Sequence, residues 1–147
     1  MAIEIEIIQA EFGSKMYANA LEIRDVVLRK PLGMRIQDDN LILDKTAVHL
    51  IALLNDEVVG TLVLSKLNKY EFKIRQVAVY ESARNSGVGS DMVKFAENIA
   101  QIHSAVQIVL HARVVVCGFY QKLGYRIEGE EFAEVGIPHI KMIKYLK

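Results

Sequence analysis

The stretch that decides the fold is QVAVYESARNSGVGS, residues 76–90. It indicates the end of a strand, a short turn, and a glycine-containing loop that leads into a helix. Gly87 and Gly89 allow a ligand to approach the backbone closely. The free N–H groups at the helix start form an anion site at the positive end of the helix dipole, and Arg84 adds a positive charge. Residues 84–90 are therefore predicted to bind a phosphate or pyrophosphate.

Two familiar phosphate motifs do not fit this loop. A Walker loop needs a Lys followed by Ser or Thr after its last glycine, and no such Lys-Ser/Thr pair follows Gly89. A dinucleotide fingerprint needs a third glycine where Met92 stands. A tight strand-to-helix turn that binds nothing is the alternative to a phosphate site.

The surrounding hydrophobic pattern predicts an α/β fold. Helical spacing begins at Ser14, a suitable N-cap, and ends before Pro31. We expect a loop with about one helical turn at 33–46, strands at 3–7, 47–54, 58–67, 72–80, 106–112 and 137–146, and further helices at 87–100 and 115–123. Strand 72–80, helix 87–100 and strand 106–112 form a βαβ unit, so the two strands are expected to be parallel.

Length and composition exclude several classes of protein. The 147 residues predict one domain, spanning 1–147, and 18 basic residues balance 18 acidic ones. Neutrality without a basic run argues against nucleic acid as a partner, and no apolar run approaches the ~20 residues of a membrane span. The lone Cys117 and the absence of zinc-ligand spacing predict no disulfide and no metal. With no visible signal peptide, a cytoplasmic location is expected.

A second motif, FYQKLGY at residues 119–125, lies about thirty residues after the glycine loop. Together, Arg84-x-x-Gly87-x-Gly89 and this segment resemble the GCN5-related N-acetyltransferase (GNAT) superfamily. Residues 134–139 look like a segment of its small bacterial ElaA/YjcF-like branch. The resemblance implies a single GNAT-type domain: a mixed central sheet with a splayed pair of parallel strands and flanking helices.

The resemblance also implies a ligand and a reaction. Acetyl-CoA, as cosubstrate, would lie in the V-shaped gap between the splayed strands, and an amine would attack its thioester directly. Tyr120 matches the family tyrosine that protonates the CoA thiolate; the alternative is a core aromatic. The cofactor-binding residues implied by the match are Val77, Ala78, Val79, Arg84, Asn85, Ser86, Gly87, Val88, Gly89, Ser90, Arg113, Phe119 and Lys122.

The sequence departs from the family at several places, among them Glu81, where many relatives have proline. Arg113 stands where the family often has Asn, and residues 73–76 supply none of the carboxylates that some relatives carry there. The general base is therefore open among His111, Glu134 and His139. His111, at a strand end, has the ordinary pKa (~6.5) suited to proton removal, but a structural His is the alternative. Glu134 and His139 are expected on the acceptor side.

Arg24 is expected near the acceptor cleft because related proteins often carry an Arg on the first helix. With Arg29, Lys30 and Arg35, it would favour an acidic group on the acceptor; a solvated helix face is the alternative. We expect an acetyl-CoA-dependent N-acetyltransferase. A catalytically silent CoA-binding or regulatory domain and a nucleotide-binding module are the competing readings. The acceptor amine and a homodimer, common among relatives, are left open.

Overall fold

The computed structural model describes residues 3–147. Within this range eight strands form one mixed sheet in the order β1-β2-β3-β4-β5-β8-β6, with β7 paired to β8. The strands are β1 Ile5–Ala10, β2 Val48–Leu54, β3 Glu57–Lys66, β4 Glu71–Val79, β5 Gln107–Arg113, β6 Arg126–Ile127, β7 Phe132–Glu134 and β8 Ile137–Tyr145. The α-helices are α1 Lys15–Arg24, α2 Val88–Ile102 and α3 Cys117–Lys122.

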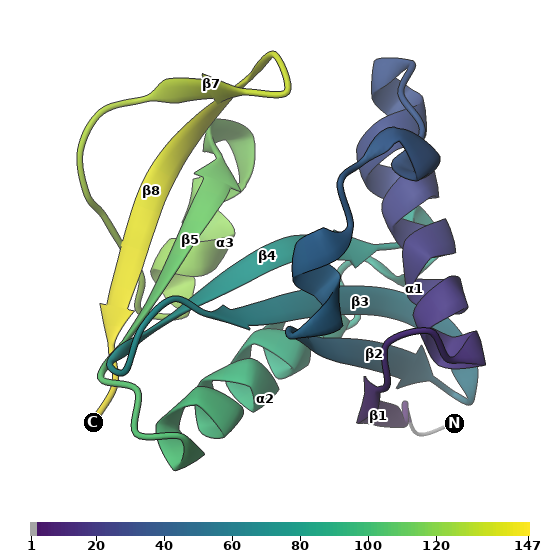
Figure 1. Cartoon of the computed structure of the whole chain (residues 1–147), viewed down its shortest axis with the longest axis horizontal. Helices are drawn as coiled ribbons and strands as arrows, with labels where there is room; N and C mark the ends of the chain where they lie inside the picture. Colours follow the sequence, from purple (N-terminus) through teal and green to yellow (C-terminus); the bar gives the residue numbers. More distant parts are fainter. Residues whose placement is uncertain (1–2) are drawn as a thin grey trace.

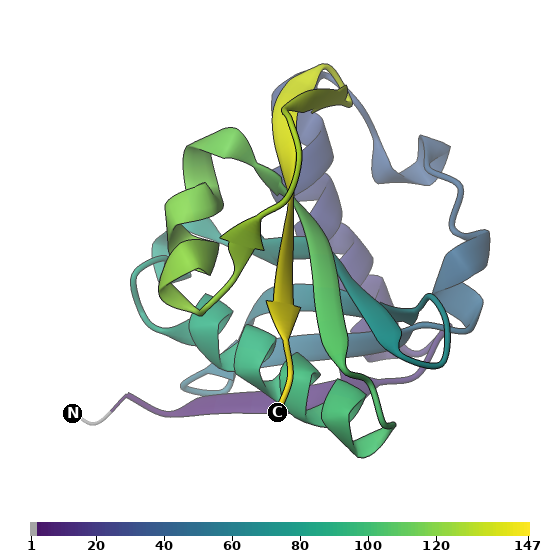
Figure 2. The same cartoon turned by 90° about the vertical axis from the view of Figure 1, so that its left-hand side faces the viewer.

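The expected βαβ unit is present, and its two strands are parallel only over a short distance. β4 pairs with β5 from Glu71 and Gln107 to Ile74 and Leu110. Beyond these residues the two strands separate, while β8 stays paired with the other edge of β5 along its whole length (Figures 1 and 2). The α/β fold with a splayed parallel pair is thus confirmed.

Successive side chains of β2 are buried on opposite faces of the sheet. Leu50 and Ala52 join a core with Met92 and Val93 of α2, whereas Ile51 packs with Ala20 of α1. Because successive strand residues point to opposite faces, α1 and α2 cover opposite sides of β2–β4 (Figure 1). The two layers fix the strands on which the site is built.

Several boundaries differ from the sequence-based expectation. Ser14 caps α1 as predicted and accepts a hydrogen bond from Tyr17 N. The helix then widens into a π-helical segment, Asp25–Arg29, and ends in a 3-10 turn, Lys30–Leu32, at Pro31. The segment 33–46 holds two 3-10 turns, Ile36–Asp38 and Ile42–Lys45, and α3 is preceded by Val114–Val116. A further 3-10 turn, Glu81–Ala83, follows β4.

A buried polar cluster ties the 33–46 segment to α1. Asp44 accepts hydrogen bonds from Tyr17 at 2.7 Å and from Arg24 at 2.8 Å, and all three side chains are buried. Burial opposes ionisation of Asp44, but the bonds from Tyr17 and Arg24 outweigh it and lower the pKa below the ordinary 3.8. The cluster is a structural anchor between two segments distant in sequence.

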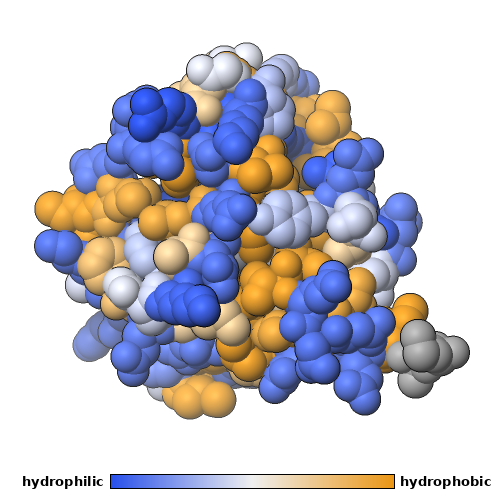
Figure 3. All heavy atoms as spheres, turned by 90° about the vertical axis from the view of Figure 1, so that its right-hand side faces the viewer, coloured by the Kyte–Doolittle hydropathy of each residue, from blue (hydrophilic) through white to orange (hydrophobic). Residues whose placement is uncertain are grey.

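The outer surface is mixed in character. The side of the molecule that bears α1 shows hydrophobic patches interrupted by hydrophilic side chains (Figure 3). Among residues 3–147, no helix has both the length and the apolar character needed to cross a membrane.

Replacing Asp44 by Asn should lower the free energy of unfolding by about 3 kcal/mol, because Arg24 keeps a buried charge without a counter-ion. Urea denaturation at pH 7 measures this, with exposed Asp38→Asn as the control. Since the folded-state pKa lies below the ordinary value, the carboxylate stabilises the fold above about pH 4 and loses this effect as pH falls. The difference between wild type and Asp44→Asn should therefore narrow in acid; a constant difference would contradict the ionised pair.

Candidate active site

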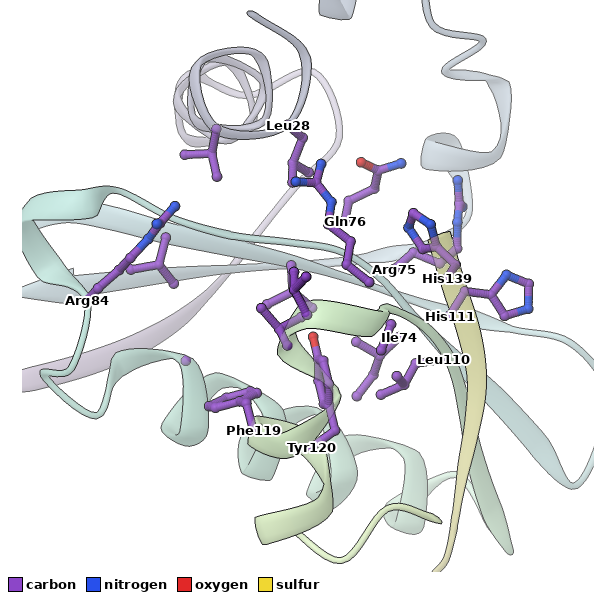
Figure 4. A pocket seen from close by; sticks show the side chains of 18 of the residues that line it. Leu28, Ile74, Arg75, Gln76, Arg84, Leu110, His111, Phe119, Tyr120 and His139 are labelled. Atoms are coloured by element: carbon purple, nitrogen blue, oxygen red, sulfur yellow. The ribbon is translucent and has the colours of Figure 1, made fainter. Parts of the chain in front are cut away.

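A cavity of about 940 Å³ opens where β4 and β5 separate (Figure 4). Residues from both faces of the sheet line it. The α2 side supplies Val88 and Gly89, and α3 supplies Phe119 and Tyr120. The opposite side receives Leu28 from the π-helical segment and Leu43 from the 33–46 segment. The opening is therefore accessible to one ligand from each face.

A bulge in β4 helps to create the opening. Gln76 has a φ of 53°, and the register between β3 and β4 shifts between Thr61 and Val63. A non-glycine residue in the left-handed region marks a local backbone constraint, and functional sites concentrate such residues. After the bulge, Ala78 and Val79 still pair with β3, but the edge of residues 77–79 that faces β5 has no strand partner.

The loop before α2 turns its backbone toward the cavity. Asn85 and Gly87 have φ values of 64° and 94°, and Gly87 caps α2 without any side-chain hydrogen bond. The first N–H groups of a helix have no intrahelical acceptor. Val88 N donates to Ser86 Oγ at 3.4 Å, and the N–H groups that follow it at the helix start are positioned for an anionic ligand.

Phe119 closes the other side of this helix start. A Cβ added to Gly89 would lie 3.3 Å from Phe119 Cζ, so only glycine leaves the ring in place without adjustment. Phe119 in turn packs edge-on against Tyr120, with ring centroids 5.0 Å apart. The aromatic pair links the loop to the interior of the gap.

The Tyr120 ring is buried, and its hydroxyl points into the gap between the strands (Figure 4). Within residues 3–147 this hydroxyl makes no hydrogen bond to another side chain or to the backbone. Burial raises the pKa of Tyr120 to about 12. The phenol therefore keeps its proton at neutral pH and has a free donor in the cavity.

Across the gap, Glu134 joins two histidines. Glu134 Oε1 lies 3.1 Å from His111 Nδ1, and Oε2 lies 3.5 Å from His139 Nε2. Lys73 Nζ is 3.4 Å from the same His111 Nδ1. Nδ1 cannot both donate to the carboxylate and accept from the ammonium. The shorter contact favours donation to Glu134, which leaves His111 Nε2 as the basic nitrogen.

The cavity brings together most of the residues that the sequence singled out. The residues that line it are Val77, Val79, Arg84, Asn85, Gly87, Val88, Gly89, Ser90, His111, Arg113, Phe119, Tyr120, Glu134 and His139. Ala78 does not line it because its side chain is buried, so only its backbone is available there. Lys122 is exposed on α3 away from the cavity.

Ser86 and Arg24 also lie outside the lining. The Ser86 hydroxyl donates to Ala83 O and accepts from Val88 N, so it shapes the loop from within. The expectation for Arg24 is wrong in both its forms: the side chain is 1% exposed and paired with Asp44, so it is neither at the cleft nor on a solvated face.

Sequence reasoning missed several lining residues, among them Lys73, Arg75 and Gln76. Residues 73–76 are noted above only for lacking a carboxylate. The available signal was the alternation of Lys73 and Arg75 with the apolar Phe72 and Ile74, which places both cations on one face of β4. No group of three or more His, Cys, Asp or Glu residues suited to a metal ion occurs among residues 3–147.

Gly87→Ala should destabilise the protein by about 1–2 kcal/mol, because the residue caps α2 in the left-handed region, which a Cβ disfavours. Thermal or urea unfolding measures the change. Gly118→Ala, at an exposed helical site with nothing within 4 Å of the added Cβ, is the matched control and should be neutral or stabilising. Equal losses in both variants would contradict the role of the Gly87 backbone.

Comparisons with known proteins agree with this geometry. The family model described as "Acetyltransferase (GNAT) domain" matches residues 26–146. The chain is 29% identical over 127 residues to the uncharacterized N-acetyltransferase YjcF of Bacillus subtilis, which covers 86% of this chain and 90% of YjcF.

Solved structures share the fold. Escherichia coli ElaA is 27% identical with a TM-score of 0.78, covering 97% of this chain and 99% of ElaA. An Elizabethkingia anophelis GNAT family acetyltransferase, solved with acetyl-CoA bound, is 22% identical with a TM-score of 0.70, covering 97% and 98%. With the matching family model and the ElaA and YjcF relatives, the chain belongs to the GNAT acetyltransferases, in the ElaA/YjcF-like branch.

Proposed function

We propose that this protein transfers the acetyl group of acetyl-CoA to an amine that enters the cavity from the opposite face of the sheet. One observation carries the proposal: the open start of α2 and the free hydroxyl of Tyr120 line the same gap between β4 and β5. The acetyl-CoA bound to the Elizabethkingia relative supports the choice of ligand.

The cofactor would use the loop and the unpaired strand edge. Backbone N–H groups of residues 85–90 would bind the pyrophosphate, with Arg84 supplying charge. The pantetheine amides would then hydrogen bond along residues 77–79, where the backbone has no strand partner on this side. This path leads the thioester from the helix start toward Tyr120.

In the proposed reaction the amine nitrogen attacks the thioester carbonyl carbon. A C–N bond forms, the C–S bond breaks, and the electron pair leaves on the CoA sulfur. The attacking nitrogen must lose a proton, and His111 Nε2 accepts it. Glu134 holds the imidazole ring in place through the hydrogen bond from Nδ1. His139, which contacts the other oxygen of Glu134, would fix the carboxylate on the acceptor side.

Tyr120 acts on the departing sulfur. A phenol with a pKa of about 12 is a weaker acid than a thiol (~8.5), so full proton transfer to a free thiolate is unfavourable. The phenol therefore acts first as a hydrogen-bond donor that stabilises the negative charge developing on sulfur as the C–S bond breaks. Transfer of its proton to sulfur is uphill by this difference in pKa and is completed when solvent reprotonates the phenolate.

Acetyl-CoA should bind with a micromolar Kd, corresponding to about −8 kcal/mol, as measured by calorimetry. Gly89→Arg should abolish this binding, because the side chain would fill the space between the helix start and Phe119. ATP and NAD should not compete. Displacement of acetyl-CoA by ATP would instead favour the nucleotide-binding module, and binding without turnover would favour the catalytically silent domain.

Tyr120→Phe should lower kcat about 100-fold and leave the Kd of acetyl-CoA nearly unchanged, because the hydroxyl acts mainly in the transition state. Initial rates of thiol release and calorimetry measure the two quantities. Tyr125→Phe is the matched control: Tyr125 is also buried, but its hydroxyl donates to Glu97 outside the cavity. An unchanged kcat in Tyr120→Phe would remove the phenol from the reaction.

His111→Gln should lower kcat/KM at pH 7 by about 100-fold, the effect typical of a lost general base. Raising the pH deprotonates the amine in solution and makes the base unnecessary, so the defect should shrink between pH 7 and pH 9.5. Glu134→Gln should show a smaller loss with the same pH trend, as expected for a positioning residue. A defect that is constant over pH would assign His111 a structural role.

A further inference from the structure

The face of the sheet opposite α2 carries an excess of positive charge inside the cavity. Ile74 of β4 packs in the core beside α2, so its neighbours Lys73 and Arg75 project to the other face. Both line the cavity, and Figure 4 shows Arg75 on the same side as Leu28 and His139. These cations therefore lie where an acceptor would enter, away from the α2 start that would bind the cofactor.

The neighbouring strand β5 adds to this charge through Arg113. On β5, Leu110 and Ala112 face the core, so His111 and Arg113 share the face of Lys73. Lys141 of β8 stands opposite His111 on the same face, but it is paired with Glu128 at 3.1 Å. Glu134 is the carboxylate that lines this cavity, and it is shared by two histidines.

Internal carboxylates do not neutralise the two β4 cations. None of the ion pairs among residues 3–147 includes Lys73 or Arg75; the polar contact of Arg75 is a 3.4 Å bond to Ser65 Oγ. Arg29, by contrast, also lines the cavity but is held by both oxygens of Asp39 at 2.8 Å. Arg29 is thus occupied, whereas Arg75 uses one donor on Ser65 and neither Lys73 nor Arg75 has a carboxylate partner among the described residues.

The surroundings of Lys73 disfavour its positive charge. Burial, together with repulsion from Arg75 and Lys141, lowers the pKa of Lys73 despite the attraction of Glu134. A ligand anion beside Lys73 and Arg75 would relieve this repulsion. A second hollow, of about 460 Å³, shares both cations and is also lined by Thr46, Ser65 and Lys66, which offer further donors to an anion.

We propose that the acceptor is a small amine that carries an anionic group, a carboxylate or a phosphate, held by Lys73 and Arg75. Lys73 Nζ lies 3.4 Å from the His111 ring, so an anion on Lys73 and an amine at His111 belong to one compact molecule. This inference rests on the proposed acetyl transfer. The sequence placed the residues that bind an acidic acceptor on the first helix. We place them on the sheet instead, because Arg24 and Arg29 are already paired with Asp44 and Asp39.

Matched pairs of amines test this inference. O-phosphoethanolamine is compared with ethanolamine, and β-alanine with β-alaninamide, by thiol release from acetyl-CoA. The anionic member of at least one pair should have a kcat/KM about tenfold or more above its neutral partner, as expected for a charge-assisted hydrogen bond. The two pairs also distinguish a phosphate from a carboxylate.

Lys73→Gln and Arg75→Gln should each raise KM for the preferred anionic amine about tenfold and leave the Kd of acetyl-CoA unchanged, which also verifies folding. Arg75→Lys should retain part of the preference. Lys69→Gln removes the same charge from an exposed residue outside both hollows and is the matched control. Neutral amines should be insensitive to all four changes.

Two results would overturn the inference while leaving acetyl transfer intact: equal use of charged and neutral partners, or a preference that survives both Gln variants. Calorimetry of the same amines with CoA-saturated protein separates the two proposals. Binding of the anionic members that depends on Lys73 and Arg75, without any turnover, would support the anion site and refute the transferase. Absence of both turnover and selective binding would refute both proposals.

Discussion

The parallel hydrogen bonding of β4 and β5 ends at Ile74 and Leu110, and every feature of the site depends on that end. Beyond it, β3 still holds the outer edge of β4 and β8 holds the outer edge of β5. The inner edges therefore separate without unravelling the sheet. Backbone groups exposed in this way need other partners, since unpaired buried N–H and C=O groups are costly. The opening is thus both a cavity and a row of hydrogen-bonding positions.

The parts of the fold with strong local patterns could be predicted from the sequence. The hydrophobic patterns of β2–β4 and of α2 each report local geometry, and the structure follows them within a few residues. The bulge at Gln76 could not be predicted, because nothing in the residue type announces a positive φ. β6 and β7, of two and three residues, are too short to show a period and exist through pairing with β8.

The residues of the candidate site also differ in whether the sequence could predict their roles. The glycine loop and Tyr120 belong to contiguous motifs, so their positions on one gap follow from the order of the elements. The roles of the arginines depend on tertiary partners. Asp44 lies twenty residues from Arg24 and Asp39 ten residues from Arg29, and only the folded chain shows that they pair. Within residues 3–147, Lys73 and Arg75 have no such partners, so the cations proposed to bind an acidic acceptor lie on β4 and not on the first helix.

The opening extends through the sheet, with α3 on one side and the 33–46 segment on the other (Figures 1 and 2). Two molecules that meet there approach from opposite directions and do not share an entrance. Under the proposed acetyl transfer, the departing thiol and the acylated product would each leave along their own route. Neither has to wait for the other to leave, and a single inhibitor that blocks both routes must pass through the sheet between β4 and β5.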